Sequence, residues 1–339
     1  MAEAGVELLA DFRRLAVMGF AEVIGQIPFF LRLLRQLRSE LDARRPDLVI
    51  PIDYPGFNMR LSRDAKLAGV PVLYYIAPQV WAWHRSRMRR LAELADRLAV
   101  ILPFEERLFR DAGARAEFVG HPLLDGPFNA GGGEELAAEL GLDPARPVVA
   151  LFPGSRAQEV ARHGELFLEV AARIQRAVPS VQPVLAVSDA VPAEAYASVP
   201  YPRTRRSREL LVLARAALVK SGTTTLEAAL SGTPMVIAYR THPLTYWLAR
   251  RLVRVDHIGL VNLVAGSRVA PEYIQSEATP DALADALLPL LEPGHPEREA
   301  ALEALALVRA SLHPRSANGA SSTADRVAGI AAELLGEGG

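Results

Sequence analysis

Short apolar runs alternate with helical patterns along the whole chain, and this alternation limits the fold more than any other feature of the sequence. In the first half the apolar runs are Asp47–Ile52, Val70–Ile76, Arg97–Leu102 and Ala116–Val119. Helical patterns lie between them, for example at Ser62–Leu67 and Phe104–Ala112. Strands that alternate with helices predict a parallel sheet that carries helices on both faces.

A glycine-rich segment, Gly126–Gly133 (GPFNAGGG), separates this half from a second one. Consecutive glycines lose much backbone entropy when they enter a helix or strand, so we interpret the segment as a linker. After it, strands are predicted at Val148–Phe152, Gln182–Val187, Ala216–Lys220 and Pro234–Tyr239, with helices at Gln158–Ala177 and Thr224–Leu230. The chain ends in predicted helices at Pro280–Leu291, Glu297–Leu312 and Ser322–Leu335.

The sequence therefore predicts two Rossmann-like α/β domains that face a cleft. They cover residues 1–130 and 131–312, and a C-terminal helix and tail, 313–339, is expected to pack back on the first domain. In open parallel sheets ligands bind beyond the carboxyl ends of the strands. Residues that directly follow predicted strands are therefore the candidates for function.

Composition excludes several classes of protein. The 339 residues, half of them hydrophobic and 23% charged, are typical of a globular protein and suffice for about two domains. Cysteine is absent, which excludes disulfides, thiol nucleophiles and cysteine-bound metal centres. A net charge of −1 disfavours a nucleic-acid partner. No apolar run reaches the roughly 18 residues of a spanning helix, and the N-terminus lacks a signal-peptide pattern, so we predict a cytoplasmic protein.

Asp53 directly follows the first apolar run, in the segment IDYPGFN. A carboxylate at the carboxyl end of a strand, beside a cleft, is well placed to act as a general base. Pro55 and Gly56 turn the chain sharply just after it. The alternative is that Asp53 only forms an Asx-turn before this Pro-Gly pair.

Two loops of the second half have the pattern of phosphate sites. Gly154, Ser155 and Arg156 lie between a predicted strand and helix, where free backbone N–H groups and the helix dipole suit a phosphate and arginine adds a bidentate donor. The alternative is an ordinary strand-to-helix loop in which Ser155 is the N-cap residue of the following helix.

The second loop, KSGTTTLE, again follows a strand and opens a helix. Its candidate ligands for phosphate and ribose are Ser221, Gly222, Thr223, Thr224 and Glu227. The alternative makes Thr223 a simple N-cap and Glu227 an acid that the helix dipole favours. Two such loops in one domain together indicate a nucleotide diphosphate such as UDP.

Several motifs are missing from the sequence. It contains no G-x-G-x-x-G after a strand, no G-x-x-x-x-G-K-[ST], no D-x-D and no His/acid cluster with metal-ligand spacing. We therefore expect neither a cofactor nor a metal. A departing diphosphate would be stabilised by Arg156 and helix N-termini.

Two stretches combine apolar and basic residues in the way that suits an anionic membrane surface. Ile27–Leu41 places Phe30, Leu34, Leu37 and Leu41 on one stripe and Arg32, Arg35 and Arg38 on the other side. Trp81–Arg90 combines Trp81 and Trp83 with Arg85, Arg87, Arg89 and Arg90. The alternatives are a packed amphipathic helix and a solvated basic face.

These segments together resemble one family. IDYPGFNMRL, YIAPQVWAWHRSRM, ILPFEERLF, FVGHPLLD, LFPGSRAQEV, KSGTTTLEAAL, MVIAYR and VNLVAG occur in the order found in lipid-A-disaccharide synthases, from about Leu15 to Leu290. The resemblance implies the two-domain GT-B glycosyltransferase fold. It also implies a metal-independent, inverting transfer of 2,3-diacylglucosamine from its UDP conjugate to 2,3-diacylglucosamine 1-phosphate, which gives the lipid A disaccharide 1-phosphate and UDP.

The resemblance also implies roles for individual residues. Asp53 matches the proposed general base of the family, Arg156 an important arginine of the GSR loop, and Asn262 the asparagine of an NLLAG-like segment, here NLVAG. Trp81, Trp83, Arg85 and His121 are assigned to the acceptor or membrane side. The family leads us to expect a homodimer, peripheral to the cytoplasmic face of the inner membrane of a Gram-negative bacterium.

One departure concerns the N-terminus. Family members begin with a strand and a glycine-rich loop, roughly GEASGD, so we expect the first domain to lack about one βα unit, through a misplaced start or a truncation. Two alternatives to the synthase stay open. One is another UDP-sugar enzyme of this fold, such as a peptidoglycan N-acetylglucosaminyl transferase or an epimerase. The other is a UDP-binding protein without activity.

Overall fold

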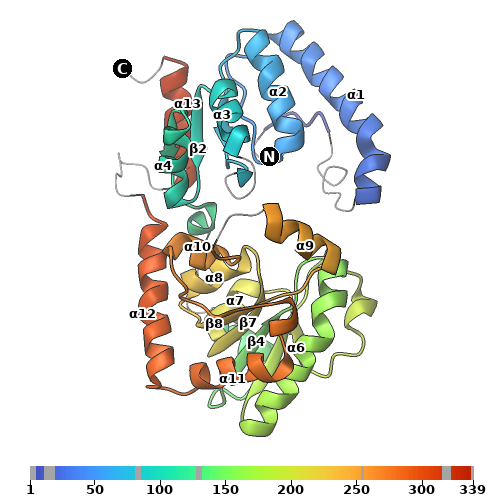
Figure 1. Ribbon diagram of the computed structural model, residues 1–339, viewed down its shortest axis with the longest axis vertical. Coiled ribbons are helices and arrows are strands. Elements are labelled where there is room, and N and C mark those ends of the chain that lie inside the picture. Colours follow the sequence, from blue (N-terminus) through green and yellow to red (C-terminus); the bar gives the residue numbers. More distant parts are fainter. Residues whose placement is uncertain are drawn as a thin grey trace. The chain divides into compact units, whose positions relative to one another are not determined.

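The computed structural model of the chain describes residues 5–10, 20–80, 85–126, 132–252, 256–314 and 322–336 (Figure 1). It divides into two compact units. The first consists of Met1–Ile101, Glu105–Val119 and Ala324–Gly339, and the second of Leu102–Phe104 and Gly120–Thr323. The chain thus enters the second unit near residue 120 and returns to the first near residue 324.

The sheet of the first unit is parallel. It contains β1 (Leu73–Tyr75), β2 (Arg97–Val100) and β3 (Ala116–Phe118) in the order β1-β2-β3. The run predicted as a strand at 47–52 lies beside β1 and makes two parallel bridges, Val49 with Val72 and Ile52 with Tyr75. It is an extended segment rather than a regular strand, and Ile52 is 41% exposed.

Helices pack on this first sheet or, as α1 (Phe20–Arg44) does, mainly on another helix of the unit. They are α1, α2 (Pro55–Leu67), α3 (Arg85–Leu94), α4 (Pro103–Asp111) and α13 (Thr323–Leu334). Successive residues of a strand point to opposite faces. Tyr74 accordingly packs in the cluster that holds Leu91 of α3 and Phe109 of α4, whereas Leu73 packs with Val327 and Ile330 of α13 and with Ala99 and Val119.

The second unit contains a six-stranded sheet. Its strands are β4 (Val148–Phe152), β5 (Gln182–Ala186), β6 (Arg203–Thr204), β7 (Ala216–Lys220), β8 (Met235–Tyr239) and β9 (Glu272–Ile274), all paired in parallel in the order β6-β5-β4-β7-β8-β9. The chain runs outward in both directions from β4, so the loops after β4 and β7 diverge. Such a switch point leaves a crevice at the carboxyl edge of the sheet.

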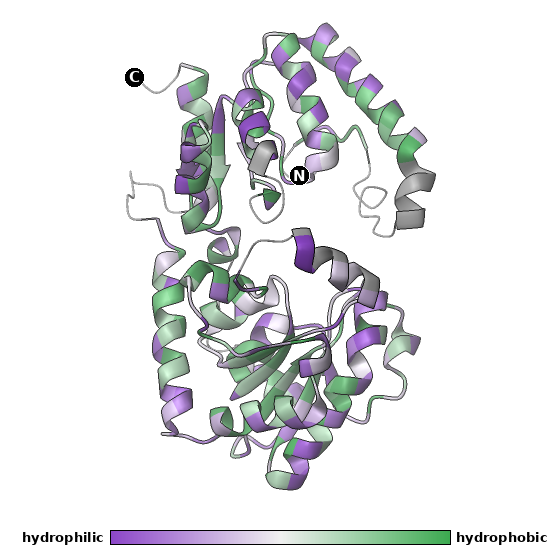
Figure 2. Ribbon diagram, in the orientation of Figure 1, coloured by the Kyte–Doolittle hydropathy of each residue, from purple (hydrophilic) through white to green (hydrophobic). Residues whose placement is uncertain are grey.

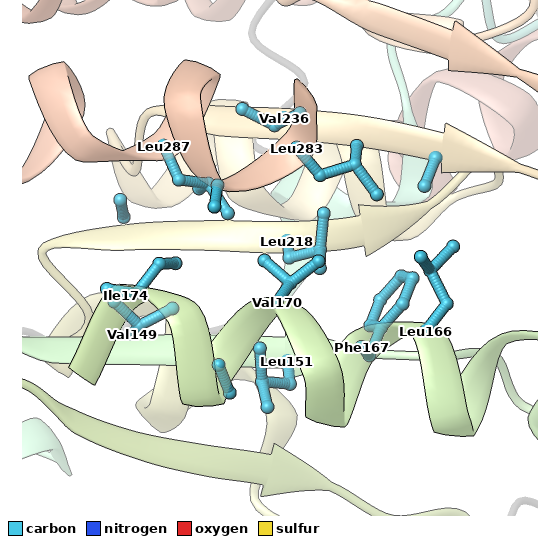
Figure 3. Close-up of a cluster of buried hydrophobic side chains, with 14 of the residues drawn as sticks. Val149, Leu151, Leu166, Phe167, Val170, Ile174, Leu218, Val236, Leu283 and Leu287 are labelled. Atoms are coloured by element: carbon cyan, nitrogen blue, oxygen red, sulfur yellow. The ribbon is translucent and has the colours of Figure 1, made fainter. Parts of the chain in front are cut away.

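The helices of the second unit are α5 (Gly132–Glu139), α6 (Ala157–Ala177), α7 (Ser207–Leu213), α8 (Thr224–Ser231), α9 (Pro243–Leu252), α10 (Leu260–Ala265), α11 (Pro280–Leu291) and α12 (Pro296–Ser311). Phe167, Val170 and Ile174 of α6 and Leu283 and Leu287 of α11 pack on apolar side chains of β4, β7 and β8 (Figure 3). In Figure 2 the strands are largely hydrophobic, and the helices alternate hydrophobic and hydrophilic residues. This periodicity explains why the sequence predicted α6, α8 and α11 within one or two residues.

The glycine-rich linker was predicted too long. Gly132 and Gly133 are the first two residues of α5, and both are buried. A Cβ at Gly132 would lie 2.7 Å from Cγ of Glu209, and one at Gly133 would lie 3.4 Å from the backbone nitrogen of Leu213. The absent side chains let α5 approach α7 closely, which compensates for the entropy that the glycines lose.

Candidate functional site

One cavity of about 440 Å³ in the second unit brings the two predicted phosphate loops together. Its lining includes Gly154, Ser155, Arg156, Ser221, Gly222, Thr223, Thr224 and Glu227, which are all of the residues predicted for nucleotide binding. We call it the two-loop cavity. It forms because the loops follow β4 and β7, which are neighbours in the sheet, so both reach the same edge.

The loop after β4 leads into α6 without a capping hydrogen bond from the side chain of the N-cap residue. Arg156, not Ser155, is the N-cap residue of α6, and its side chain makes no capping hydrogen bond. The Ser155 N–H instead donates to Oε2 of Glu159 at 3.0 Å. Gly154 has φ +133°, where other residues are strained, and a Cβ there would lie 2.7 Å from that same oxygen.

The loop after β7 is similar. Thr223 is the N-cap residue of α8, again without a capping hydrogen bond from its side chain. The hydroxyl of Ser221 donates to the Ile258 carbonyl at 2.8 Å, which ties this loop to the segment before α10. Burial raises the pKa of Glu227 in the cavity wall, although Arg208 partly opposes this.

Charged residues that the sequence analysis missed complete the cavity. Lys220 lies at the end of β7, and its Nζ is 2.8 Å from Oε1 of Glu159, which Arg156 also contacts at 3.2 Å. Burial alone would raise the pKa of Glu159, but Lys220, the Ser155 N–H and Arg156 outweigh burial and lower it. Lys220 is the last residue of a predicted strand and one of only two lysines, and this is the signal that could have identified it.

The end of β5 contributes a third loop. Ser188 and Asp189 line the cavity, and the Ser188 hydroxyl donates to the Ser155 carbonyl at 3.1 Å. Arg205, also in the lining, is paired with Asp189 at 2.6 Å. Ser188 and Asp189 come directly after the strand predicted at Gln182–Val187, so the rule that singled out Asp53 would have found them too.

Asn262 is fully buried, with 0% exposure. Its amide nitrogen donates to the Ala270 carbonyl at 2.8 Å and to Glu272 at 2.7 Å. Its oxygen accepts from the N–H groups of Val269 and Ala270, each at 2.9 Å. The amide has used its hydrogen-bonding capacity inside the fold, so Asn262 can influence a substrate only through the segments that it holds.

Asp53 lies in the first unit, at the carboxyl end of the extended segment, with an exposed side chain. Asp53 and Tyr54 adopt the left-handed conformation, with φ values of 49° and 46°. The Asp53 carbonyl accepts hydrogen bonds from the Tyr74 hydroxyl and from Nδ2 of Asn58, both at 2.7 Å, and Nδ2 of Asn58 also donates to the Ile52 carbonyl at 2.9 Å. We call Tyr74 and Asn58 the Asp53 clamp. Strained backbone held in place around an exposed carboxylate is typical of functional sites.

The other predicted residues of the first half are placed as follows. Trp81 and Trp83 lie outside the described residues, and Arg85 is the first residue of α3. His121 is 6% exposed, and its Nδ1 accepts from the Leu123 N–H at 3.2 Å, which caps the short helix η4 (Pro122–Asp125). Burial lowers the pKa of the His121 ring to about 4.

Helix α1 uses only part of its apolar surface for packing. Leu34 and Leu41 are buried, and the Phe30 ring lies 5.7 Å from that of Tyr54. Ile27 and Leu31 are each 46% exposed. These two side chains line a groove of about 660 Å³ together with Leu34, Arg35, Arg38, Arg60, Arg63 and Asp64.

Bilayer-spanning helices and clusters of metal ligands are both absent from the described part of the structure. No helix there combines the length and the apolar character that crossing a bilayer requires. No group of three or more histidine or acidic side chains, within those same residues, is arranged to hold a metal ion.

Comparison with known proteins gives a consistent match. The family model described as LpxB, lipid-A-disaccharide synthetase, matches residues 1–327. The lipid-A-disaccharide synthase of Geobacter sulfurreducens is 43% identical over 345 residues, which cover 99% of this chain and 88% of that protein. That of Coxiella burnetii is 38% identical over 316 residues, which cover 92% of this chain and 84% of the relative.

Solved structures that resemble the chain are more distant in sequence. The structure of S. aureus MnaA with UDP has a TM-score of 0.62 at 10% identity and covers 99% of this chain and 86% of its own. UDP-GlcNAc 2-epimerase from Neisseria meningitidis, bound to UDP-GlcNAc, has a TM-score of 0.55 at 12% identity, with 84% of this chain and 78% of that one covered. These likenesses, with the two parallel sheets, confirm the predicted α/β fold of the GT-B class.

Proposed function

This chain belongs to the lipid-A-disaccharide synthase family and is a glycosyltransferase of lipid A synthesis, and we propose that it moves 2,3-diacylglucosamine from its UDP conjugate to 2,3-diacylglucosamine 1-phosphate. The products are the lipid A disaccharide 1-phosphate and UDP. The family match does not favour the peptidoglycan transferase, the epimerase or the inactive protein considered above. The observation that carries the proposal is the two-loop cavity.

The two-loop cavity suits the diphosphate of a UDP-sugar. Its loops offer the Ser155 N–H and the Arg156 guanidinium at the start of α6, and hydroxyl groups at the start of α8. Backbone N–H groups at helix N-termini and arginine are the donors that phosphates prefer in proteins. The UDP and UDP-GlcNAc complexes of the structurally similar proteins support a nucleotide of this kind.

Asp53 is the proposed general base for the acceptor 6-hydroxyl. The donor is an α-linked sugar and the product is β-linked, so the hydroxyl displaces UDP directly and with inversion. This reaction needs one base to accept the hydroxyl proton and cationic groups to stabilise the departing diphosphate. Asp53 supplies the first, and Arg156 with the N-termini of α6 and α8 supplies the second, without a divalent metal.

The groove beside α1 supports binding at the cytoplasmic face of the inner membrane. Both substrates carry acyl chains, so the enzyme must take them from a lipid surface. Exposed Ile27 and Leu31 lie beside Arg35, Arg38 and Arg60. Apolar side chains next to arginines match the acyl chains and the anionic headgroups of such a surface.

The test is turnover of the full chain with the acylated donor and acceptor, with products identified by mass spectrometry. We expect the tetra-acylated disaccharide 1-phosphate and UDP. Asp53→Asn should lower kcat by a factor of about 10² or more and leave UDP binding intact. Epimerised UDP-GlcNAc, or no disaccharide from folded protein, would contradict the proposal.

A further inference from the structure

We propose that Lys220 is a further diphosphate-binding residue and that Glu159 is an internal anion that the donor displaces from it. This inference rests on the proposed function, because it assigns a diphosphate to the two-loop cavity. Neither residue takes part in the reaction proposed above.

The carboxylate of Glu159 occupies the position that an anionic ligand would take. It accepts from the Ser155 N–H at 3.0 Å, from Arg156 at 3.2 Å and from Lys220 at 2.8 Å. A loop N–H, a guanidinium and an ammonium group are the donors that bind phosphate in proteins. In the free protein, therefore, a carboxylate of the chain itself satisfies donors suited to phosphate.

Space in the loop points the same way. Gly154 has no side chain, and a Cβ there would collide with Cβ and Oε2 of Glu159. The close approach of Glu159 thus depends on this glycine. The side chains of Lys220 and Glu159 are only 16% and 14% exposed, so water screens their attraction weakly.

The charge of the two-loop cavity favours displacement of the Glu159 carboxylate by the diphosphate over binding of the diphosphate beside it. Its basic lining residues are Arg156, Arg205 and Lys220, and its acidic ones are Glu159, Asp189 and Glu227. These charges balance formally, so a diphosphate entering beside Glu159 would meet like charge at short range. If Glu159 moves away, Lys220, Arg156 and the Ser155 N–H become available to the phosphates at once.

The exchange of Glu159 for the diphosphate as the partner of Lys220 also assists product release. When UDP leaves, Glu159 can return to Lys220, so no buried ammonium group is left unpaired. Glu159 therefore weakens UDP binding and speeds its departure. Lys220 does the opposite, because it holds the diphosphate.

Binding titrations of the full-length protein test the proposal, with UDP, UMP and uridine as probes. Lys220→Met should weaken UDP binding about tenfold or more, because a charge-assisted hydrogen bond is lost, and should leave uridine binding unchanged. Glu159→Gln keeps the size of the side chain and removes its charge. It should tighten UDP binding by about threefold to tenfold, with the smallest effect on uridine.

Controls separate this effect from general damage. Lys66→Met removes the other lysine of the chain, which pairs with Asp96 at 3.1 Å in the first unit, and should leave UDP affinity unchanged. Lys220→Arg keeps the charge and should recover most of the affinity. In the Lys220→Met background, Glu159→Gln should tighten UDP binding less than it does in the parent protein.

The outcomes distinguish the two proposals. If the folded parent protein binds neither UDP nor uridine, the proposed function itself fails. If it binds UDP but Lys220→Met has no effect, the role of Lys220 is refuted. If Glu159→Gln weakens UDP binding, then Glu159 arranges the cations for phosphate instead of competing with it, and the displacement is refuted.

Discussion

Loosening the Asp53 clamp should lower turnover, and each hydrogen bond removed should increase the loss. Tyr74→Phe deletes the hydroxyl that donates to the Asp53 carbonyl, and Asn58→Ala deletes the donor to the Ile52 and Asp53 carbonyls. Burial, together with the nearby Asp53 carboxylate, raises the pKa of the Tyr74 hydroxyl, so this group stays a protonated donor. Neither variant changes the Asp53 carboxylate itself.

The structure allows the size of the effect to be worked out. Two left-handed residues, Asp53 and Tyr54, cost about 2 kcal/mol together. Three clamp hydrogen bonds at about 1 kcal/mol each leave a margin of about 1 kcal/mol in favour of this turn. Tyr74→Phe removes that margin, so the turn is populated about half the time and kcat falls about twofold. Asn58→Ala removes two bonds, and kcat falls about fivefold. The double variant should lose about 25-fold.

The assay measures UDP release at saturating substrate and, in parallel, unfolding in urea. Unfolding free energies should fall by about 1 kcal/mol or less for each variant, because the turn relaxes to its unclamped form and this limits the loss to about the margin. Thr233→Val is the matched control, because it removes a buried hydroxyl that donates to the Leu211 carbonyl at 2.6 Å in the second unit. Thr233→Val should lose a similar amount of unfolding free energy and keep the kcat of the parent protein. Clamp variants that lose stability and keep the kcat of this control would refute the reasoning.

Three further predictions concern pH, stability and metal. The pKa of His121 is about 4 in the folded protein and about 6.5 in the unfolded chain, so only the unfolded chain gains a proton as pH falls. Protonation of His121 in the unfolded chain should lower the unfolding free energy by about 2 kcal/mol between about pH 7 and pH 5. His121→Asn keeps the capping acceptor, and its unfolding free energy in urea should depend on pH less by that amount. Asn262→Ala should cost about 3–4 kcal/mol in the same measurement, since four buried hydrogen bonds are lost; a cost under about 1 kcal/mol would contradict its place in the fold. Excess chelator should leave turnover unchanged, and a loss that Mg²⁺ reverses would show that a metal handles the leaving group.

Sequence patterns predicted the second unit more closely than the first. β4 and β7 are strands of five residues, with the predicted bounds, because fully buried parallel strands are continuous apolar runs. β6 and β9 were missed, since strands of two and three residues carry too little periodicity to detect. The run at 47–52 has the composition of a strand, but the chain pairs it at two positions only.

The candidate site was predicted where residue type and position after a strand were enough. The two loops predicted to bind phosphate fall in this group, since their residues, Arg156 and Thr223 among them, line one cavity. The Asp53 clamp could not be predicted, because Tyr74 comes from a strand 21 positions later and its hydroxyl reaches Asp53 only in the folded unit. The pairing of Glu159 with Lys220, 61 positions apart, is hidden for the same reason.

The path of the chain between the two units affects the order in which they can fold on the ribosome. The first unit needs α13, because Val327 and Ile330 complete the cluster with Leu73, and α13 follows nearly all of the second unit in the sequence. The Thr323 N–H donates to Asp125, 198 positions earlier, where the chain left the first unit. At about 5–20 residues per second, the first unit waits roughly 10–40 s for its final helix. The second unit, nearly continuous in sequence, can finish folding before the unit that was begun first.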